Sequence, residues 1–189
     1  MSTPYVPPLL LGRTVVGMPV VDASTGDDLA EVRDVVFDPT RGGLTGFTLT
    51  KRGFWRGRLK QVLPVDGVLS VGTHAVMVED ERALADPSDA PADVRDADPA
   101  ADVVGNIVVT ESGRQLGELA DVVIVGGPAP HVVGYAVSGG LVGDGLIPLH
   151  AHSGLSASAL VVPDELENRV RSDLTGLAAE LADLERSRS

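Results

Sequence analysis

The stretch Leu29–Val36, which reads Leu-Ala-Glu-Val-Arg-Asp-Val-Val, decides the fold because it returns as Leu116–Val123, Leu-Gly-Glu-Leu-Ala-Asp-Val-Val. Four further blocks repeat around it in the same order: Gly17 with Val20–Val21 as Gly105 with Val108–Val109, Leu44–Leu49 as Val132–Val137, Val62–Val65 as Leu146–Leu149, and Ala75–Val78 as Ala159–Val162. Matched blocks in one order indicate two copies of one small domain.

Composition limits what these copies can be. The chain has 189 residues, so each copy is small and only marginally stable alone, which favours packing of one copy on the other. Aromatic residues make up 3%, so the cores are expected to consist of Val, Leu, Ile and Ala. The absence of cysteine excludes disulfides and thiolate metal sites. No apolar stretch reaches the roughly 18 residues of a membrane span, and the opening residues do not resemble a signal peptide. We expect a cytoplasmic protein.

The net charge of −12 argues against a general nucleic-acid binder, because it repels phosphate backbones at long range. Short β-branched and apolar runs, separated by Gly- and Pro-rich turns, favour strands in both copies. We therefore predict a mainly β protein with two small antiparallel barrels in tandem, because parallel strands would need long crossovers.

Two segments fall outside the repeat. Residues 80–102 carry many carboxylates and three prolines, so we expect a solvated linker there. After Pro163 the apolar period changes to steps of four and three, which predicts an amphipathic helix over 164–186. This helix either docks on a barrel or pairs with another helix through one apolar stripe: Leu166, Val170, Leu174, Leu177, Leu181 and Leu184.

The blocks resemble a PRC-barrel domain, the small β-barrel of the photosynthetic reaction-centre H subunit and of the C-terminal half of a ribosome maturation factor. The likeness rests on Gly17–Asp22, Leu29–Pro39, Gly46–Thr50 and Val62–Val65. It covers about residues 11–79 in the first copy and 103–163 in the second. The resemblance implies an adaptor in protein assemblies, without shared catalytic residues and without a cofactor. We therefore expect no enzymatic activity.

Asp34 and Asp121 are the best-supported structural positions. Strand alternation would place Asp34 in one row with Ala30, Val32 and Val36, a carboxylate among apolar neighbours. We interpret each Asp as an acceptor of backbone N–H bonds from a turn. Further residues at matching positions of the copies are also expected to be structural: Gly46 and Gly134, Pro64 and Pro148.

The loop 51–60 is the oddest local feature, because it gathers cations and the only tryptophan in an acidic protein. Trp and Arg are common interface anchors, so this loop is a candidate site for an acidic protein partner or for this protein's own acidic surface. A solvated hairpin that covers the barrel end is the structural alternative, and anionic lipid or RNA are further ones. The candidate residues are Arg52, Phe54, Trp55, Arg56 and Arg58.

Other motifs point to no chemistry. His150 and His152 could face one way in an extended segment, but no third ligand is evident, so we expect surface histidines and no metal site. The leading hypothesis is a non-enzymatic adaptor that binds protein partners, including a second copy as a homodimer. The alternatives are a ribosome- or RNA-associated assembly factor, which would use the 51–60 loop locally, and a small-ligand binder with a pocket between the barrels.

Overall fold

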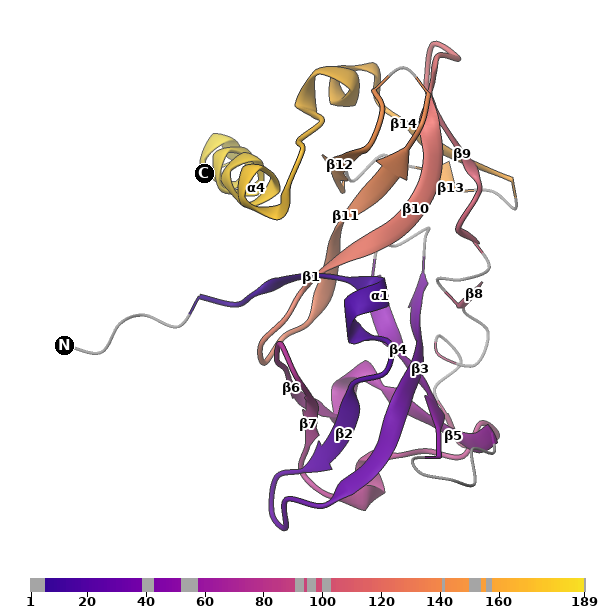
Figure 1. The fold of residues 1–189 in the computed structure, drawn as a ribbon, viewed down its shortest axis with the longest axis vertical. Coiled ribbons are helices and arrows are strands. Elements are labelled where there is room, and N and C mark those ends of the chain that lie inside the picture. Colours follow the sequence, from indigo (N-terminus) through magenta and orange to yellow (C-terminus); the bar gives the residue numbers. More distant parts are fainter. Residues whose placement is uncertain are drawn as a thin grey trace, which may run out of the picture.

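The chain folds into two sheets, seen here in a computed structural model (Figure 1). The structure describes residues 6–38, 43–51, 58–90, 94, 98–99, 103–140, 142–149, 154–155 and 158–188. The first sheet contains β2 (Pro19–Asp22), β3 (Asp28–Asp38), β4 (Gly43–Thr50), β5 (Arg58–Pro64), β6 (Val68–Val71) and β7 (Val76–Val78). The second contains β9 (Ile107–Thr110), β10 (Gln115–Val125), β11 (His131–Ser138), β12 (Gly145–Pro148), β13 (Gly154–Leu155) and β14 (Ala159–Val162). The protein is therefore mainly β, as predicted, with two barrel-like units.

The two sheets have the same strand order, and their longest strands pair with their neighbours in the same register. The first runs β5-β4-β3-β2-β7-β6, and the second runs β12-β11-β10-β9-β14-β13. Asp34 pairs with Thr48 just as Asp121 pairs with Ala136. A register shift precedes each Asp, between Val32 and Asp34 and between Leu119 and Asp121. The β-bulges of β3 therefore repeat in β10, so the sequence repeat is a structural repeat.

One strand pair in each sheet departs from the antiparallel arrangement that we predicted. β2 pairs in parallel with β7, and β9 pairs in parallel with β14. The physical reason is that the last strand of each unit, β7 or β14, returns to the first only after the whole meander. That meander supplies the length of chain that a parallel crossover requires.

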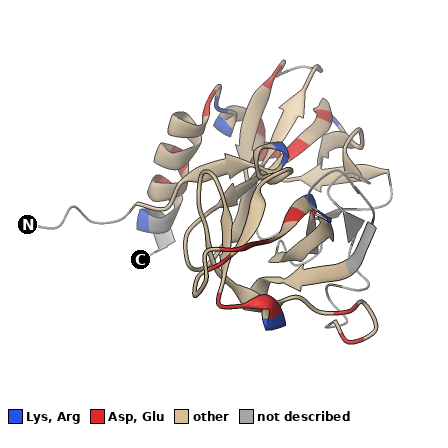
Figure 2. Ribbon diagram, turned by 60° about the horizontal axis from the view of Figure 1, so that its bottom comes forward, with Lys and Arg blue, Asp and Glu red and all other residues tan. Residues whose placement is uncertain are grey.

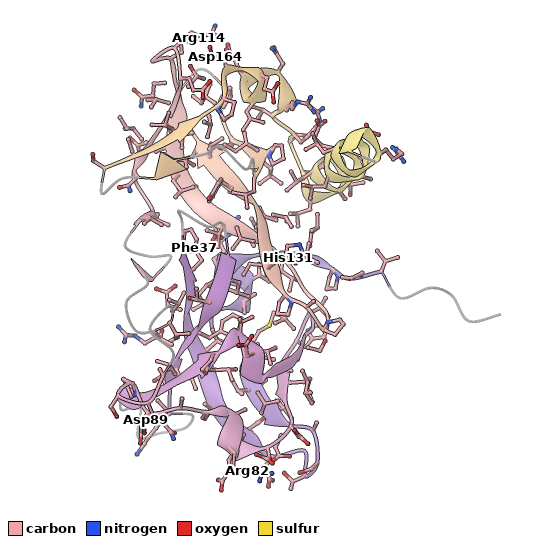
Figure 3. All side chains as sticks on the ribbon, turned by 180° about the vertical axis from the view of Figure 1, so that it is seen from behind. Phe37, Arg82, Asp89, Arg114, His131 and Asp164 are labelled. Atoms are coloured by element: carbon pink, nitrogen blue, oxygen red, sulfur yellow. The ribbon has the colours of Figure 1, made fainter. Side chains whose placement is uncertain are left out.

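Each unit receives a short strand from the segment that leads into the other unit. β1 (Leu9–Leu11) precedes the first unit, yet it pairs with Val123–Val125 of β10 in the second unit. β8 (Asp98–Pro99) precedes the second unit and pairs with Val36 and Phe37 of β3 in the first. In Figure 3, Phe37 lies near the middle of the molecule, where the two units meet. The two units therefore exchange strands reciprocally.

The core is continuous between the units. One buried apolar cluster contains residues of both, from Leu10 through Phe47 and Tyr135 to Leu166. β4 of the first unit contacts β11 of the second. Val71 and Gly127 add a bridge, in which the N–H of each donates to the carbonyl of the other at 3.0 and 2.7 Å. Units too small to be stable alone thus share one core.

The segments outside the repeat are more structured than their composition indicates. In the linker 80–102, a 3-10 helix η2 (Glu81–Ala83) precedes a bridge between Ala85 and Val62 of β5. Ala90 and Val94 are buried. The expectation of a wholly solvated linker therefore differs from the structure, because its few apolar residues find buried positions.

The C-terminal helix α4 (Leu174–Arg188) begins later than the predicted 164, and a 3-10 helix η3 (Asp164–Arg169) precedes it. A bridge between Arg171 and Leu146 of β12 separates the two helices, which is why one continuous helix does not form. α4 docks on the outer face of the second unit, where Leu177 is fully buried beside Val123 and Val133. Within the part of the chain that the structure describes, no helix is long and apolar enough to cross a bilayer.

Candidate functional site

Asp121 holds the first turn of the helix α1 (Gly12–Val15), which enters from the other unit with β1. One carboxylate oxygen accepts the N–H of Val122 at 2.8 Å, and the other accepts the N–H of Arg13 at 3.1 Å. Gly12 lets the helix approach, because a Cβ there would lie 2.7 Å from a carboxylate oxygen of Asp121. Burial raises the pKa of Asp121, opposed by the N–H groups of Arg13 and Val122. This arrangement positions the backbone of α1 on β10.

Asp34 occupies the equivalent place in the first unit, where it accepts the N–H of Val35 at 2.8 Å. The expected row of Ala30, Val32, Asp34 and Val36 is wrong, because the bulge before Asp34 reverses the alternation. Val35 and Phe37 therefore face the core with Val32, while Val36 lies outside that cluster. A bulge of this kind re-aims one side chain, here the carboxylate.

The paired glycines and prolines meet across neighbouring strands. Gly46 pairs with Pro64, and Gly134 pairs with Pro148 in the same register. A Cβ on Gly46 would collide with the carbonyl oxygen of Leu63, and one on Gly134 would lie 2.5 Å from that of Ile147. Both positions therefore demand glycine for close approach of the strands.

The predicted helix stripe divides between two environments. Leu166 is fully buried in the shared core beneath η3, and Val170 packs partly against that core. On α4, Leu174, Leu177 and Leu181 cover the outer face of the second unit, and Leu184 is half-buried. Glu180 is buried beside them and accepts hydrogen bonds from Arg169 (2.6 Å) and Arg171. These contacts hold α4 to the segment that precedes it.

The candidate binding loop lies largely outside the described residues. This applies to Arg52, Phe54, Trp55 and Arg56, and Arg58 is described only as the backbone that begins β5. His150 and His152 also lie outside. Among the described residues there is no cluster of His, Asp and Glu able to hold a metal ion.

A cavity of about 590 Å³ opens where the exchanged segment meets the second unit and the start of α4. Its apolar lining includes Leu11, Ala136 and Leu146. Arg13, Asp144 and Asp173 supply charged groups at its walls. Apolar walls with a few polar groups are typical of small-ligand pockets.

Apolar side chains are exposed on and beside the parallel strand pair of each unit, where they form two apolar surfaces. The first apolar surface consists of Val16, Pro19, Val21, Leu69 and Met77, and the second of Val104, Ile107, Val109, Ala159 and Val161. Their most exposed members keep between 37% and 48% of their surface accessible: Val16, Leu69, Val104, Ile107 and Val161. Neither surface is predicted above, although both copies carry apolar residues at matching positions of these strands, such as Val21 and Val109.

The fold and these features define a class of protein. It is a mainly β protein of two barrel-like units, in which the carboxylates of Asp34 and Asp121 accept backbone N–H groups. The family comparison agrees for the first unit. Residues 8–85 match the PRC-barrel domain family, so the chain carries a PRC-barrel domain there. The match begins with β1 and ends at Ala85, the residue that bridges to β5. No curated protein matches the chain.

Proposed function

We propose that this protein is a non-enzymatic adaptor that holds protein partners through tandem PRC barrels. We count the second unit as the second barrel because its strand order equals that of the matched unit, and because β9, β10 and β11 pair with the same register and the same bulges as β2, β3 and β4. The pair of exposed apolar surfaces carries the proposal, since contiguous apolar patches on a protein surface mark interaction sites.

The test is affinity capture from the native cell with the second apolar surface altered. Ile107→Lys with Val161→Lys should abolish capture of the specific partners that the unaltered protein retains. Ala178→Lys with Ala179→Lys, both at exposed positions of α4, is the matched control for two added positive charges and should capture them all. Identical partners for all three proteins would remove the second apolar surface from the proposal.

The cavity favours a second candidate, a small-ligand binding module. The segment of β1 and α1 leads into the first unit but contacts the second unit, and the cavity lies at this contact. This place is close to the pocket expected between the barrels. A ligand held there should raise the melting temperature of the folded chain. Leu146→Trp, which adds volume to the cavity wall, should reduce that shift.

A further inference from the structure

The two apolar surfaces occupy equivalent positions in the repeat. Val21 lies opposite Met77 across the parallel pair of the first unit, and Val109 lies opposite Val161 in the second. The preceding strand residues, Pro19 and Ile107, each pair with a glutamate of the neighbouring long strand, Glu31 and Glu118. Each surface is therefore an apolar patch with a carboxylate at its edge.

Duplication alone does not explain this likeness, because the other outer faces of the units have diverged. Thr45 and Thr48 of β4 stand where the second unit has Val133 and Ala136. The helix α4 packs on the second of these faces, against Val133 and Ala136. The two copies thus differ where one binds a helix, yet both remain apolar on the parallel pairs.

We infer that the two apolar surfaces bind the same kind of partner, an amphipathic segment with an apolar row flanked by Lys or Arg, one on each unit. This inference rests on the proposed adaptor function. The carboxylates of Glu31 and Glu118 and the net charge of −12 favour a basic partner and disfavour a second copy of this chain. Figure 2 shows Asp and Glu (red) at many places along the ribbon.

The placement of the surfaces allows both to be occupied at once. In Figure 1, β2 and β7 lie at the lower left of the molecule, whereas β9 and β14 lie at the upper right. A partner on one pair therefore leaves the other accessible. With both filled, the chain joins two partner segments, and its tandem structure gives it a bridging role that one unit would lack.

The test is isothermal titration calorimetry of the full chain with an amphipathic Leu/Lys peptide. We expect two equivalent sites, and a scrambled peptide of the same composition and a Leu/Glu peptide of the same pattern should not bind. Met77→Lys or Ile107→Lys should each leave one site, and the double variant none. Glu118→Gln should weaken one site and reduce its dependence on salt.

Several results would overturn the inference: one site on the unaltered chain, two sites on either single variant, or equal binding of the Leu/Glu or scrambled peptide. Circular dichroism checks that each variant is folded, and Ile107→Thr serves in place of Ile107→Lys if the latter does not fold. Suppose that Ile107→Lys with Val161→Lys loses the native partners, but that the unaltered chain binds only one Leu/Lys peptide. These results would reject the second equivalent site and would still support the adaptor function. Native partners captured by the double variant would instead reject the apolar surfaces as the adaptor's binding sites.

Discussion

Arg13 and Asp121 are joined by a hydrogen bond of 3.1 Å from the backbone N–H of Arg13 to a carboxylate oxygen of Asp121, although 108 positions separate them in the chain. The bond fixes α1, and with it β1, on the second unit. Their side chains also approach, with Nε of Arg13 3.9 Å from the carboxylate, but Arg13 is largely exposed there. Exposed ion pairs contribute little to the stability of a fold, so the hydrogen bond from the backbone N–H of Arg13 is the more important part of this contact.

Removing either of the two equivalent carboxylates, that of Asp121 or that of Asp34, should destabilise the fold. Asp121→Ala leaves the N–H groups of Arg13 and Val122 without this acceptor, and each unsatisfied buried donor costs about 1–3 kcal/mol. We expect the melting temperature to fall by several degrees, and Asp34→Ala to act in the same direction. Asp89→Ala, at an exposed position, is the control. Unchanged melting of the Asp121 variant would refute the structural role.

The exchanged strand should stabilise the unit that receives it. Leu10 is buried in the shared core and pairs with Ile124 of β10. We expect Leu10→Ala to cost about 2–5 kcal/mol and to speed amide hydrogen exchange of Val123–Val125, in the other unit. Val6→Ala, at an exposed position nearby, should change neither. Faster amide hydrogen exchange in the first unit alone would contradict the pairing of β1 with β10 in the second unit.

The strands could be predicted because each copy alternates runs of β-branched residues with Gly- and Pro-rich turns. The exchange of β1 and β8 between the units could not be predicted, since β1 is a run of three leucines and β8 is an Asp-Pro pair. Such short runs have no measurable period, and pairing over so long a separation leaves no local signal. The bulge before Asp34 was hidden for a similar reason, because it inserts one residue without changing composition.

The helix stripe shows how a correct spacing can give a wrong boundary. Leu166 and Val170 continue the helical period of α4, but they are apolar because they pack against the shared core beneath η3. The backbone between them and α4 pairs with β12 through Arg171. Of the predicted sites, the glycine, proline and aspartate positions can be read from the repeat, whereas the apolar surfaces require knowing which face of each strand is exposed.

Acid should weaken the contact of Asp164 with the turn after β9. The pKa of Asp164 is lowered because Ser112 donates its backbone N–H at 3.0 Å and its hydroxyl at 2.8 Å. Figure 3 shows Asp164 beside Arg114 at this end of the molecule. The unfolded carboxyl binds its proton at a higher pH than the folded one, so stability is complete above the ordinary pKa and is lost as the pH falls through the lowered value.

Chemical denaturation over a pH series checks this sign. The difference in unfolding free energy between the unaltered chain and Asp164→Asn should be present at neutral pH and shrink as the pH falls below the ordinary pKa of 3.8. Asp121→Asn should show the opposite pH trend, because burial raises the pKa of Asp121 and the folded state binds its proton first. A difference for Asp164→Asn that is independent of pH would contradict the assignment.

Tyr135→Phe should stabilise the protein. Tyr135 is fully buried, burial raises its pKa to about 12, and within the described part of the chain its hydroxyl has no hydrogen-bond partner. The first unit has Phe47 at the equivalent position, where Val35 faces it as Val122 faces Tyr135. Replacing the hydroxyl therefore removes a polar group without leaving another unpaired, and we expect a gain of about 1 kcal/mol by urea denaturation. The reciprocal change, Phe47→Tyr, should destabilise the first unit, because it buries a hydroxyl in an apolar core. A loss of stability in Tyr135→Phe would show that the hydroxyl is hydrogen-bonded in solution.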